Sequence, residues 1–315
     1  MLTLPDKWVW DHWMVDTGSE YHIFYLQAPR SLGDPDLRHQ HARTGHAVST
    51  DLVRWEILPD ALDAGAPGAW DDRATWTGSI VRKGDTWCCF YTGSQNAEKG
   101  LIQRIGLATS HDLVHWERYG DRPLISSDAR WYETLDLSKW HDEAWRDPWV
   151  FADPDGNGWH ALITARANHG PADERGVVGH AWSPDLLAWE VRPPLSEPGE
   201  FGHLEVNQVE IVNGQPVLLF CTGSGQISGR RRARVGTEPS ATFAAPAASL
   251  LGPYDLANAV PVSELYAGRI VRMRDGRWAL MGFINEPGGG PFVGSIGDPV
   301  PVDELPGFPG GATPR

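Results

Sequence analysis

The sequence predicts an all-β fold, a five-bladed β-propeller, and three observations carry that prediction. The motif GHAVSTDLVRWE at residues 45–56 returns as GLATSHDLVHWE at 106–117 and as GHAWSPDLLAWE at 179–190. The chain contains 16 Trp, 35 Gly and 25 Pro, a composition that indicates many short strands and tight turns rather than long amphipathic helices. Five units of roughly 60 residues each can be traced, and each has room for about four short strands, as a propeller blade has.

Each unit contains a hairpin-like pair of strands, and in the first three units this pair precedes the repeated motif. Turn chemistry such as Lys83-Gly84-Asp85 supports the hairpins. In chain order the units are marked by residues 21–27, 80–87, 150–159, 206–222 and 269–285. We expect residues 1–300 to form a single propeller and the Gly/Pro-rich stretch 301–315 to be a flexible tail. A two-sheet sandwich in which the repeats are coincidental is the alternative fold.

Charge and cysteine content limit the classes of partner and compartment. The net charge of −14 argues against nucleic acid or an anionic membrane as a partner, because both require a basic surface, whereas a neutral sugar is compatible with it. No apolar run is long enough to span a bilayer, and the start MLTLPDKW lacks a signal-peptide pattern. Three cysteines cannot build a disulfide framework, so we expect buried free thiols and a cytoplasmic location. The oligomeric state is left open.

Three carboxylates are the candidate catalytic residues. They occupy near-equivalent places in units one, three and four: Asp11 lies thirteen residues before Phe24, Asp147 twelve before Trp159, and Glu205 thirteen before Leu218. In a propeller such positions converge at one mouth of the central funnel, and two carboxylates that flank a glycosidic bond are sufficient for hydrolysis. One of them, with a pKa raised by apolar surroundings and nearby negative charge, would donate the proton. Asp147 next to Arg146 is also compatible with a structural ion pair, and Glu205 has a rival in Glu210.

Aromatic and polar neighbours of these carboxylates are the candidate sugar-binding residues. Indoles around a carboxylate make a pocket in which the apolar faces of a sugar ring can stack, and His12 fits a hydrogen-bond partner better than a base. The predicted substrate-binding set is Trp10, His12, Trp13, Trp76, Thr77, Arg146 and Asp72, the last as either a loop cap or a leaving-group contact. No Cys-x-x-Cys pair, His/Cys cluster or EF-hand spacing is present, so we expect neither a metal nor another cofactor.

Several motifs resemble glycoside hydrolase families 32 and 68, the β-fructofuranosidases and fructosyltransferases. Residues 45–59 closely resemble the family 32 pattern G-H-A-x-S-x-D-L-V-x-W-x-x-x-P, and 21–25 (YHIFY) resemble its Y-H-L-F-Y strand. Residues 76–79 (WTGS) resemble F-S-G-S, or W-S-G-S of family 68, and 146–151 (RDPWVF) resemble R-D-P-x-V-F. The resemblance implies a retaining mechanism with Asp11 as nucleophile, Glu205 as acid/base and Asp147 as transition-state stabiliser, with Arg146 and Trp76 lining the same subsite.

The sequence departs from family 32 in the surroundings of two carboxylates. The family pattern W-M-N-D-P-N-G keeps only its Trp and Asp here, so that the stretch is closer to W-D-x-W of family 68. We expect a propeller alone, without the β-sandwich usual in family 32. The pattern E-C-P-D survives only as Glu205, and Leu26 replaces a Gln. These changes bear on which sugar is bound more than on the mechanism.

The function that these features favour is a retaining glycosidase acting on small β-D-fructofuranosides, sucrose or short fructo-oligosaccharides, with hydrolysis and fructosyl transfer both compatible. A family 43-like arabinofuranosidase or related pentosidase is the first alternative, because it uses the same three-carboxylate layout. A carbohydrate-binding propeller without catalysis is the second. The motif at 45–55 favours the fructosidase.

Overall fold

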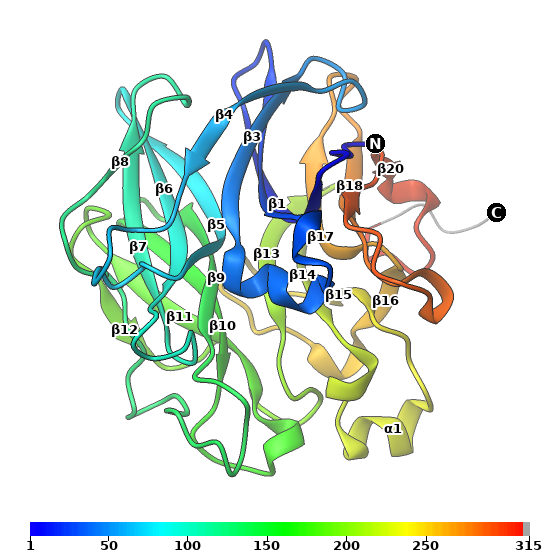
Figure 1. Cartoon of the computed structure of the whole chain (residues 1–315). Coiled ribbons are helices and arrows are strands. Elements are labelled where there is room, and N and C mark those ends of the chain that lie inside the picture. Colours follow the sequence, from blue (N-terminus) through cyan, green and yellow to red (C-terminus); the bar gives the residue numbers. More distant parts are fainter. Residues whose placement is uncertain (311–315) are drawn as a thin grey trace.

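Five antiparallel sheets follow one another along the chain and form a ring around a central axis (Figure 1). The computed structural model describes residues 1–310. The first sheet contains β1 (Lys7–Asp16), β2 (Tyr21–Pro29), β3 (Arg43–Ser49) and β4 (Glu56–Leu62), and the second β5 (Ala74–Lys83), β6 (Thr86–Ser94), β7 (Gln103–Ser110) and β8 (Glu117–Arg118). The third contains β9 (Trp145–Ala152), β10 (Trp159–Arg166), β11 (Gly176–Ser183) and β12 (Glu190–Arg192).

The last two blades have the same order of strands. The fourth consists of β13 (Glu205–Val212), β14 (Gln215–Thr222), β15 (Ala241–Pro246) and β16 (Val260–Ser263). The fifth consists of β17 (Tyr266–Arg272), β18 (Trp278–Ile284) and β19 (Ser295–Ile296), with β20 (Val300–Pro301) also paired to β18. The predicted five-bladed propeller is therefore confirmed, and residues 1–310 contain no additional β-sandwich.

The innermost strands β1, β5, β9, β13 and β17 contact one another around the axis, and β1 against β17 closes the ring. A bridge between Leu2 and Ile296 adds to this closure. The apolar core lies between neighbouring blades, where side chains such as Phe90 and Ile163, both fully buried, belong to one cluster. No helix within residues 1–310 is long and apolar enough to cross a membrane.

The repeated sequence motif forms the turn between the third and fourth strands of a blade. In the first copy the Ser49 hydroxyl accepts the backbone N–H of Leu52 at 2.8 Å, and the Asp51 carboxylate accepts the N–H groups of Val53 and Arg54 at 3.0 and 2.8 Å. Leu52 has a φ of 64° and is 1% exposed, so the turn also places an apolar side chain in the core. The equivalent hydrogen bonds recur in the other two copies.

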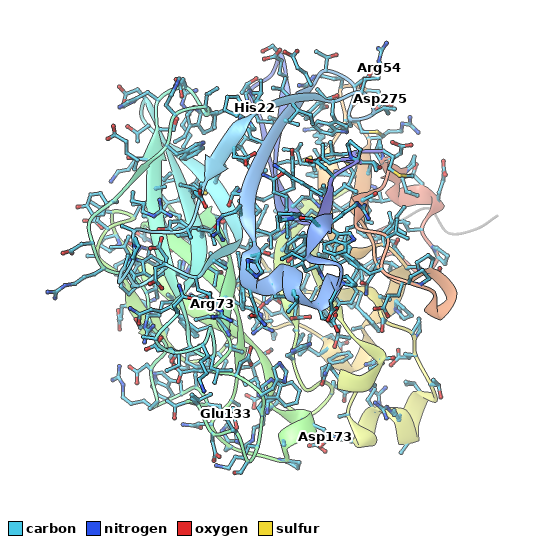
Figure 2. All side chains as sticks on the ribbon, in the orientation of Figure 1. His22, Arg54, Arg73, Glu133, Asp173 and Asp275 are labelled. Carbon is cyan, nitrogen blue, oxygen red and sulfur yellow. The ribbon has the colours of Figure 1, made fainter. Side chains whose placement is uncertain are left out.

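The two ends of the ring differ (Figure 2). Short turns lie at one end, where Arg54 and Asp275 are labelled, and the longer connections that hold Glu133 and Asp173 lie at the other. The longer connections include the 3-10 helix η2 (Pro35–His41), the segment 119–144, which contains no helix, and the α-helix α1 (Gly229–Val235).

The packed part of the fifth blade continues past residue 300, where the sequence suggested that a flexible tail begins. Val302, Leu305 and Phe308 are at most 9% exposed and belong to the apolar cluster of the fourth and fifth blades. Burial of these side chains fixes residues 301–310 against the propeller. Residues 311–315, the rest of the predicted tail, lie outside the described part of the chain.

Candidate active site

A cavity of about 410 Å³ opens between the inner strands and the long connections. Its walls include residues from all five blades. The residues that line the cavity, including those of the connections, are Trp10, Asp11, Leu26, Arg38, His39, Trp76, Thr77, His141, Asp142, Arg146, Asp147, Glu205, Val206, Tyr266, Phe283 and Asn285.

Every inner strand contains a β-bulge, and residues at these bulges line the cavity. The register shifts lie between Trp10 and His12, between Trp76 and Gly78, and at the corresponding places of β9, β13 and β17. A bulge adds one residue to its strand and re-aims side chains. The residue before each bulge lines the cavity in all five strands (Trp10, Trp76, Arg146, Glu205 and Tyr266), and the next residue lines it in four (Asp11, Thr77, Asp147 and Val206).

The three predicted carboxylates meet in this cavity, although their positions are less equivalent than the residue counts suggested. Asp11 and Asp147 are bulge residues with positive φ, 27° and 57°. Glu205 stands one residue before the bulge of β13, at the place that Trp10 and Arg146 occupy in their strands. The difference arises because β13 places Val206, with a φ of 55°, at the bulge itself.

Asp11 lies on β1 and accepts a hydrogen bond from the Thr77 hydroxyl of β5. The pKa of Asp11 is raised to about 6. Burial and, to a smaller extent, the nearby Glu205 raise it, while the Thr77 hydrogen bond and the charge of Arg269 act in the opposite direction. The carboxyl group is thus half-titrated near pH 6, rather than near 4 as an exposed aspartate would be.

Arg146 connects the other carboxylates. Its Nη2 donates to Glu205 Oε1 at 2.7 Å, its Nη1 donates to Asp142 Oδ2 at 3.1 Å, and its Nε lies 3.5 Å from Asp147 Oδ2. Although burial opposes the charged form, these three carboxylates hold the pKa of Arg146 well above its usual value. One buried cation therefore balances a cluster of acids that would otherwise repel one another.

Asp147 and Glu205 have shifted pKa values of opposite sign. Burial raises the pKa of Asp147 to about 7, even though Arg146 is adjacent and Thr164 donates a hydrogen bond at 2.9 Å. Burial would also raise the pKa of Glu205, but the charges and hydrogen bonds of His203 and Arg146 hold it well below its usual range. Tyr266 donates to the same carboxylate at 2.9 Å. The raised pKa expected of a proton donor is thus found at Asp11 and Asp147, and not at Glu205 while Arg146 is bound to it.

Four of the predicted substrate-binding residues lie on the cavity wall, namely Trp10, Trp76, Thr77 and Arg146. Trp76 is fixed by a hydrogen bond from its Nε1 to the carbonyl oxygen of His39 at 2.8 Å. The indoles and the carboxylates therefore come together as the sequence suggested.

The other three predicted substrate-binding residues do not reach the cavity. His12 is fully buried, and Trp13 is 1% exposed and stacks on Phe24 with 6.2 Å between the ring centroids. Both follow the bulge of β1, after which the side chains of the strand turn into the core. Asp72 caps a loop instead, since its carboxylate accepts the N–H groups of Gly68 and Asn96 at 2.9 and 2.7 Å.

Several wall residues were not predicted from the sequence. Arg38 and His39 come from η2, and His141 and Asp142 come from the connection before β9. No motif marks them, because their place depends on how these connections fold over the blades. Tyr266 could have been found, since it stands in the fifth unit where Trp10 stands in the first.

Within residues 1–310 no group of three or more His, Cys, Asp or Glu side chains has an arrangement that could hold a metal ion. The carboxylates of Asp11, Asp147 and Glu205 in the cavity are already hydrogen-bonded by Thr77, Thr164, Arg146 and Tyr266. What the cavity can offer a ligand is a set of closely spaced carboxyl groups in a partly apolar, indole-lined enclosure.

Comparison with known proteins gives one matching family and a set of partial relatives. The family described as glycosyl hydrolases family 32 N-terminal domain matches residues 5–289. The vacuolar acid beta-fructofuranosidase 2 of a Rosa hybrid cultivar is 32% identical over 132 residues, which cover 38% of this chain and 19% of that protein. The sucrose-6-phosphate hydrolase of Zymomonas mobilis is 35% identical over 106 residues, 32% of this chain and 19% of the relative. The chain therefore matches only about a fifth of the length of these relatives.

Solved structures share the fold over most of the chain. Inulosucrase from Halalkalicoccus jeotgali bound to kestose has a TM-score of 0.72 at 23% identity and covers 91% of this chain and 79% of its own. The Bombyx mori GH32 beta-fructofuranosidase has a TM-score of 0.63 at 20% identity and covers 89% of this chain and 56% of its own. At these identities the similarity establishes the propeller fold.

Proposed function

Because the chain belongs to glycosyl hydrolase family 32, we propose that it cleaves small β-D-fructofuranosides, sucrose or short fructo-oligosaccharides, with retention of configuration. The observation that carries the proposal is the meeting of Asp11, Asp147 and Glu205 with Arg146 in one cavity of about 410 Å³. We further propose that residues 1–300 act as a single catalytic domain, which the closed ring of five blades supports.

In the proposed reaction the Asp11 carboxylate attacks the anomeric carbon of the fructosyl unit. The bond between that carbon and the leaving oxygen breaks, and the oxygen takes a proton from Glu205. A water molecule then attacks the same carbon and gives its proton to Glu205, while the bond to Asp11 breaks. If a sugar hydroxyl replaces the water, the fructosyl unit is transferred instead. Asp147 and Arg146 would hold the fructosyl hydroxyls and offset the positive charge of the transition state.

Glu205 must be protonated to act as the acid, and Arg146 offers a way to reach that state. In the free protein Arg146 Nη2 holds the Glu205 carboxylate at 2.7 Å. A sugar hydroxyl that accepts a hydrogen bond from Arg146 would weaken this pair, and loss of a nearby cation raises the pKa of a buried carboxyl group. Substrate binding would thereby bring the acid to its protonated form.

The charge of the cavity favours a neutral substrate over a sugar phosphate. Four carboxyl groups line it (Asp11, Asp142, Asp147 and Glu205), whereas two guanidinium groups do (Arg38 and Arg146). Arg146 is already engaged by three of these carboxylates. A phosphate would meet excess negative charge here, and we propose sucrose rather than its 6-phosphate as substrate.

A proton NMR time course on sucrose, kestose and a panel of arabinofuranosides tests the proposal. We expect release of fructose whose first-formed anomer keeps the configuration of the substrate. Turnover of pentosides alone would favour the arabinofuranosidase alternative, and inversion would move Asp11 to the role of general base. Absence of turnover with retained sugar binding would favour a carbohydrate-binding propeller.

The variant Glu205→Gln tests the role of the acid, and Glu210→Gln is its matched control. Both residues lie on β13, five positions apart, and only Glu205 lines the cavity. We expect Glu205→Gln to abolish turnover of sucrose while binding persists, and Glu210→Gln to retain activity. Equal loss in both variants would contradict the assignment.

We also propose a reducing, cytoplasmic location and no partnership with nucleic acid or membranes. Cys88, Cys89 and Cys221 are free and buried, which suits a compartment without disulfide formation. The net charge of −14 supports the proposal that neither nucleic acid nor a membrane is a partner.

A further inference from the structure

His141 lines the cavity, but the proposed mechanism does not yet use it. It stands near the end of the connection that leads from β8 into β9, shortly before Arg146. Its side chain is 61% exposed, whereas that of Asp147, on the same cavity wall, is 5% exposed. The imidazole ring is therefore placed at the open end of the cavity, where a ligand can reach it.

The connection holds His141 in place through packing and a hydrogen bond. The ring of Trp140 lies 4.9 Å from that of His141, measured between the centroids, at an interplanar angle of 33°. The guanidinium of Arg166 on β10 lies 3.6 Å from the centroid of the same indole. After His141 in the chain, the backbone N–H of Glu143 donates to the carbonyl oxygen of Leu101 at 2.8 Å. The chain is thus fixed on both sides of His141, which lowers the entropy that this residue would lose on contact with a ligand.

Asp142, the next residue, has one carboxylate oxygen with two hydrogen-bond donors and one with none. Its Oδ2 accepts from Gln103 Nε2 at 3.0 Å and from Arg146 Nη1 at 3.1 Å. Its Oδ1 is buried and has no hydrogen-bond partner within residues 1–310. The Nε2 of His141 lies 3.7 Å from this oxygen, which is slightly beyond the length of a hydrogen bond. A small rotation of the imidazole ring would close the gap.

The free oxygen of Asp142 favours one tautomer of His141. A buried carboxylate oxygen without a donor is costly, so the favoured ring has its proton on Nε2, directed at Asp142. Partial burial lowers the pKa of His141, and although the charge of Asp142 opposes this shift, that of Arg146 supports it. The ring is therefore largely neutral at pH 7. Its Nδ1 is then an acceptor for a donor outside the protein, such as a hydroxyl group.

The bonds of Asp142 place His141 on the leaving-group side of the site. The guanidinium of Arg146 binds Asp142 through Nη1 at 3.1 Å and Glu205 through Nη2 at 2.7 Å. Because the two terminal nitrogens of a guanidinium are neighbours in one plane, these two carboxylates lie side by side. In the proposed reaction Glu205 protonates the leaving oxygen. The group attached to that oxygen must extend from Glu205 toward the opening of the cavity, where the exposed ring of His141 lies.

We propose that His141 is a specificity residue of the proposed fructosidase, whose Nδ1 accepts a hydrogen bond from a hydroxyl group of the leaving-group sugar while Asp142 holds the ring from the other side. The inference rests on the proposed function and assigns a residue to its leaving-group subsite. The contact selects fructosides that carry a second sugar over simple alkyl fructosides, because an alkyl group offers no hydroxyl to the ring.

Kinetics on two fructosides that differ only in the leaving group test the inference. Sucrose releases glucose, whereas methyl β-D-fructofuranoside releases methanol. The variant His141→Phe keeps a ring that can pack on Trp140 but removes both nitrogens. We expect the ratio of kcat/KM on sucrose to kcat/KM on the methyl fructoside to fall about threefold to tenfold, mainly through a higher KM for sucrose.

The same substitution at another exposed histidine is the matched control. His111 follows β7 in a turn and does not line the cavity, so His111→Phe should keep the wild-type ratio. His141→Ala, which removes the ring altogether, should lower the ratio as His141→Phe does and serves if the phenylalanine variant does not fold. An unchanged ratio in both variants of His141 would overturn the inference, as would an equal fall in His111→Phe.

NMR of ¹⁵N-labelled histidine gives a readout that does not need turnover. In the free wild-type protein we expect the ring proton of His141 on Nε2. In Glu205→Gln, sucrose should shift the Nδ1 resonance of His141 and methyl β-D-fructofuranoside should shift it less. A ring proton on Nδ1 in the free protein, or an Nδ1 resonance that does not respond to sucrose, would overturn the inference. If the wild type turned over no fructoside, the proposed function would fail, while the response of Nδ1 to sucrose would still decide whether His141 contacts the sugar.

Discussion

Replacement of Thr77 by valine tests how the nucleophile proposed here is kept ionised. Valine has nearly the shape of threonine but cannot donate the hydrogen bond that the Thr77 hydroxyl gives to Asp11. The Asp11 carboxylate would lose one of the groups that oppose the effect of burial on its pKa, which is about 6 in the intact site. We expect the pKa of Asp11 to rise and activity at acidic pH to fall.

The size of the effect follows from the kind of bond. A hydrogen bond to a charged group contributes about 1.5–3 kcal/mol, and 1.36 kcal/mol corresponds to one pKa unit. Loss of the bond would therefore raise the pKa of Asp11 by about one to two units, and kcat/KM at pH 5 would fall about tenfold to a hundredfold. Above the new pKa the two proteins should differ much less.

The assay is the pH profile of kcat/KM for sucrose, and Thr75→Val is the matched control. Thr75 is fully buried on the same strand and shares a hydrogen bond with Thr44 at 3.4 Å, away from the cavity wall. It should therefore lose stability, while its ratio of kcat/KM at pH 5 to kcat/KM at pH 8 stays at the wild-type value. An equal ratio in Thr77→Val and the wild type would refute the reasoning, as would an equal change of the ratio in both variants.

Three other predictions follow from the same site and from the buried thiols. The pKa of the Asp147 carboxyl group is raised to about 7 in the folded protein, so the stability that its protonated form contributes is present at low pH and lost as the pH rises through 7. Asp147→Asn should therefore raise the free energy of unfolding at pH 8 by roughly 2–4 kcal/mol, measured by urea denaturation. A variant less stable than the wild type at this pH would contradict the prediction. Trp76→Ala should raise the KM for sucrose about tenfold with a smaller change in kcat, because the variant loses a stacking surface on the cavity wall. An unchanged KM in initial-rate measurements would contradict this prediction. Burial raises the pKa of the thiols of Cys88, Cys89 and Cys221. In a colorimetric assay the native protein should therefore not react with a thiol reagent, whereas the denatured protein should show all three thiols. Rapid reaction of the native protein would contradict the prediction.

The architecture was predictable because the repeated motif has a local physical role. Ser49, Asp51 and Leu52 form one turn through bonds between near neighbours, and the same residue types do so twice more along the chain. Local chemistry of this kind is visible in a sequence. Three copies at similar spacing were sufficient to indicate blades and to predict where the inner strands begin.

The site was only partly predictable, because the bulges cannot be counted from the sequence. A reading of the sequence without bulges places His12 and Trp13 as close to a sugar as Trp10 and makes Glu205 equivalent to Asp11. One extra residue in a strand changes which side chains face the cavity and which enter the core. Cavity residues in the connections, such as His141, depend on packing between distant segments, and no local pattern reports that packing.

The five bulges also make the cavity modular. Four of the inner strands contribute two adjacent positions to the cavity wall and β17 contributes one, and a substitution of a side chain there leaves the backbone pairing of the blade intact. Trp10 and Val206 occupy such positions without carrying the proposed proton or nucleophile chemistry. A combinatorial library confined to these two sites could therefore change the shape of the sugar pocket while the turns and the strand pairing of the scaffold stay in place.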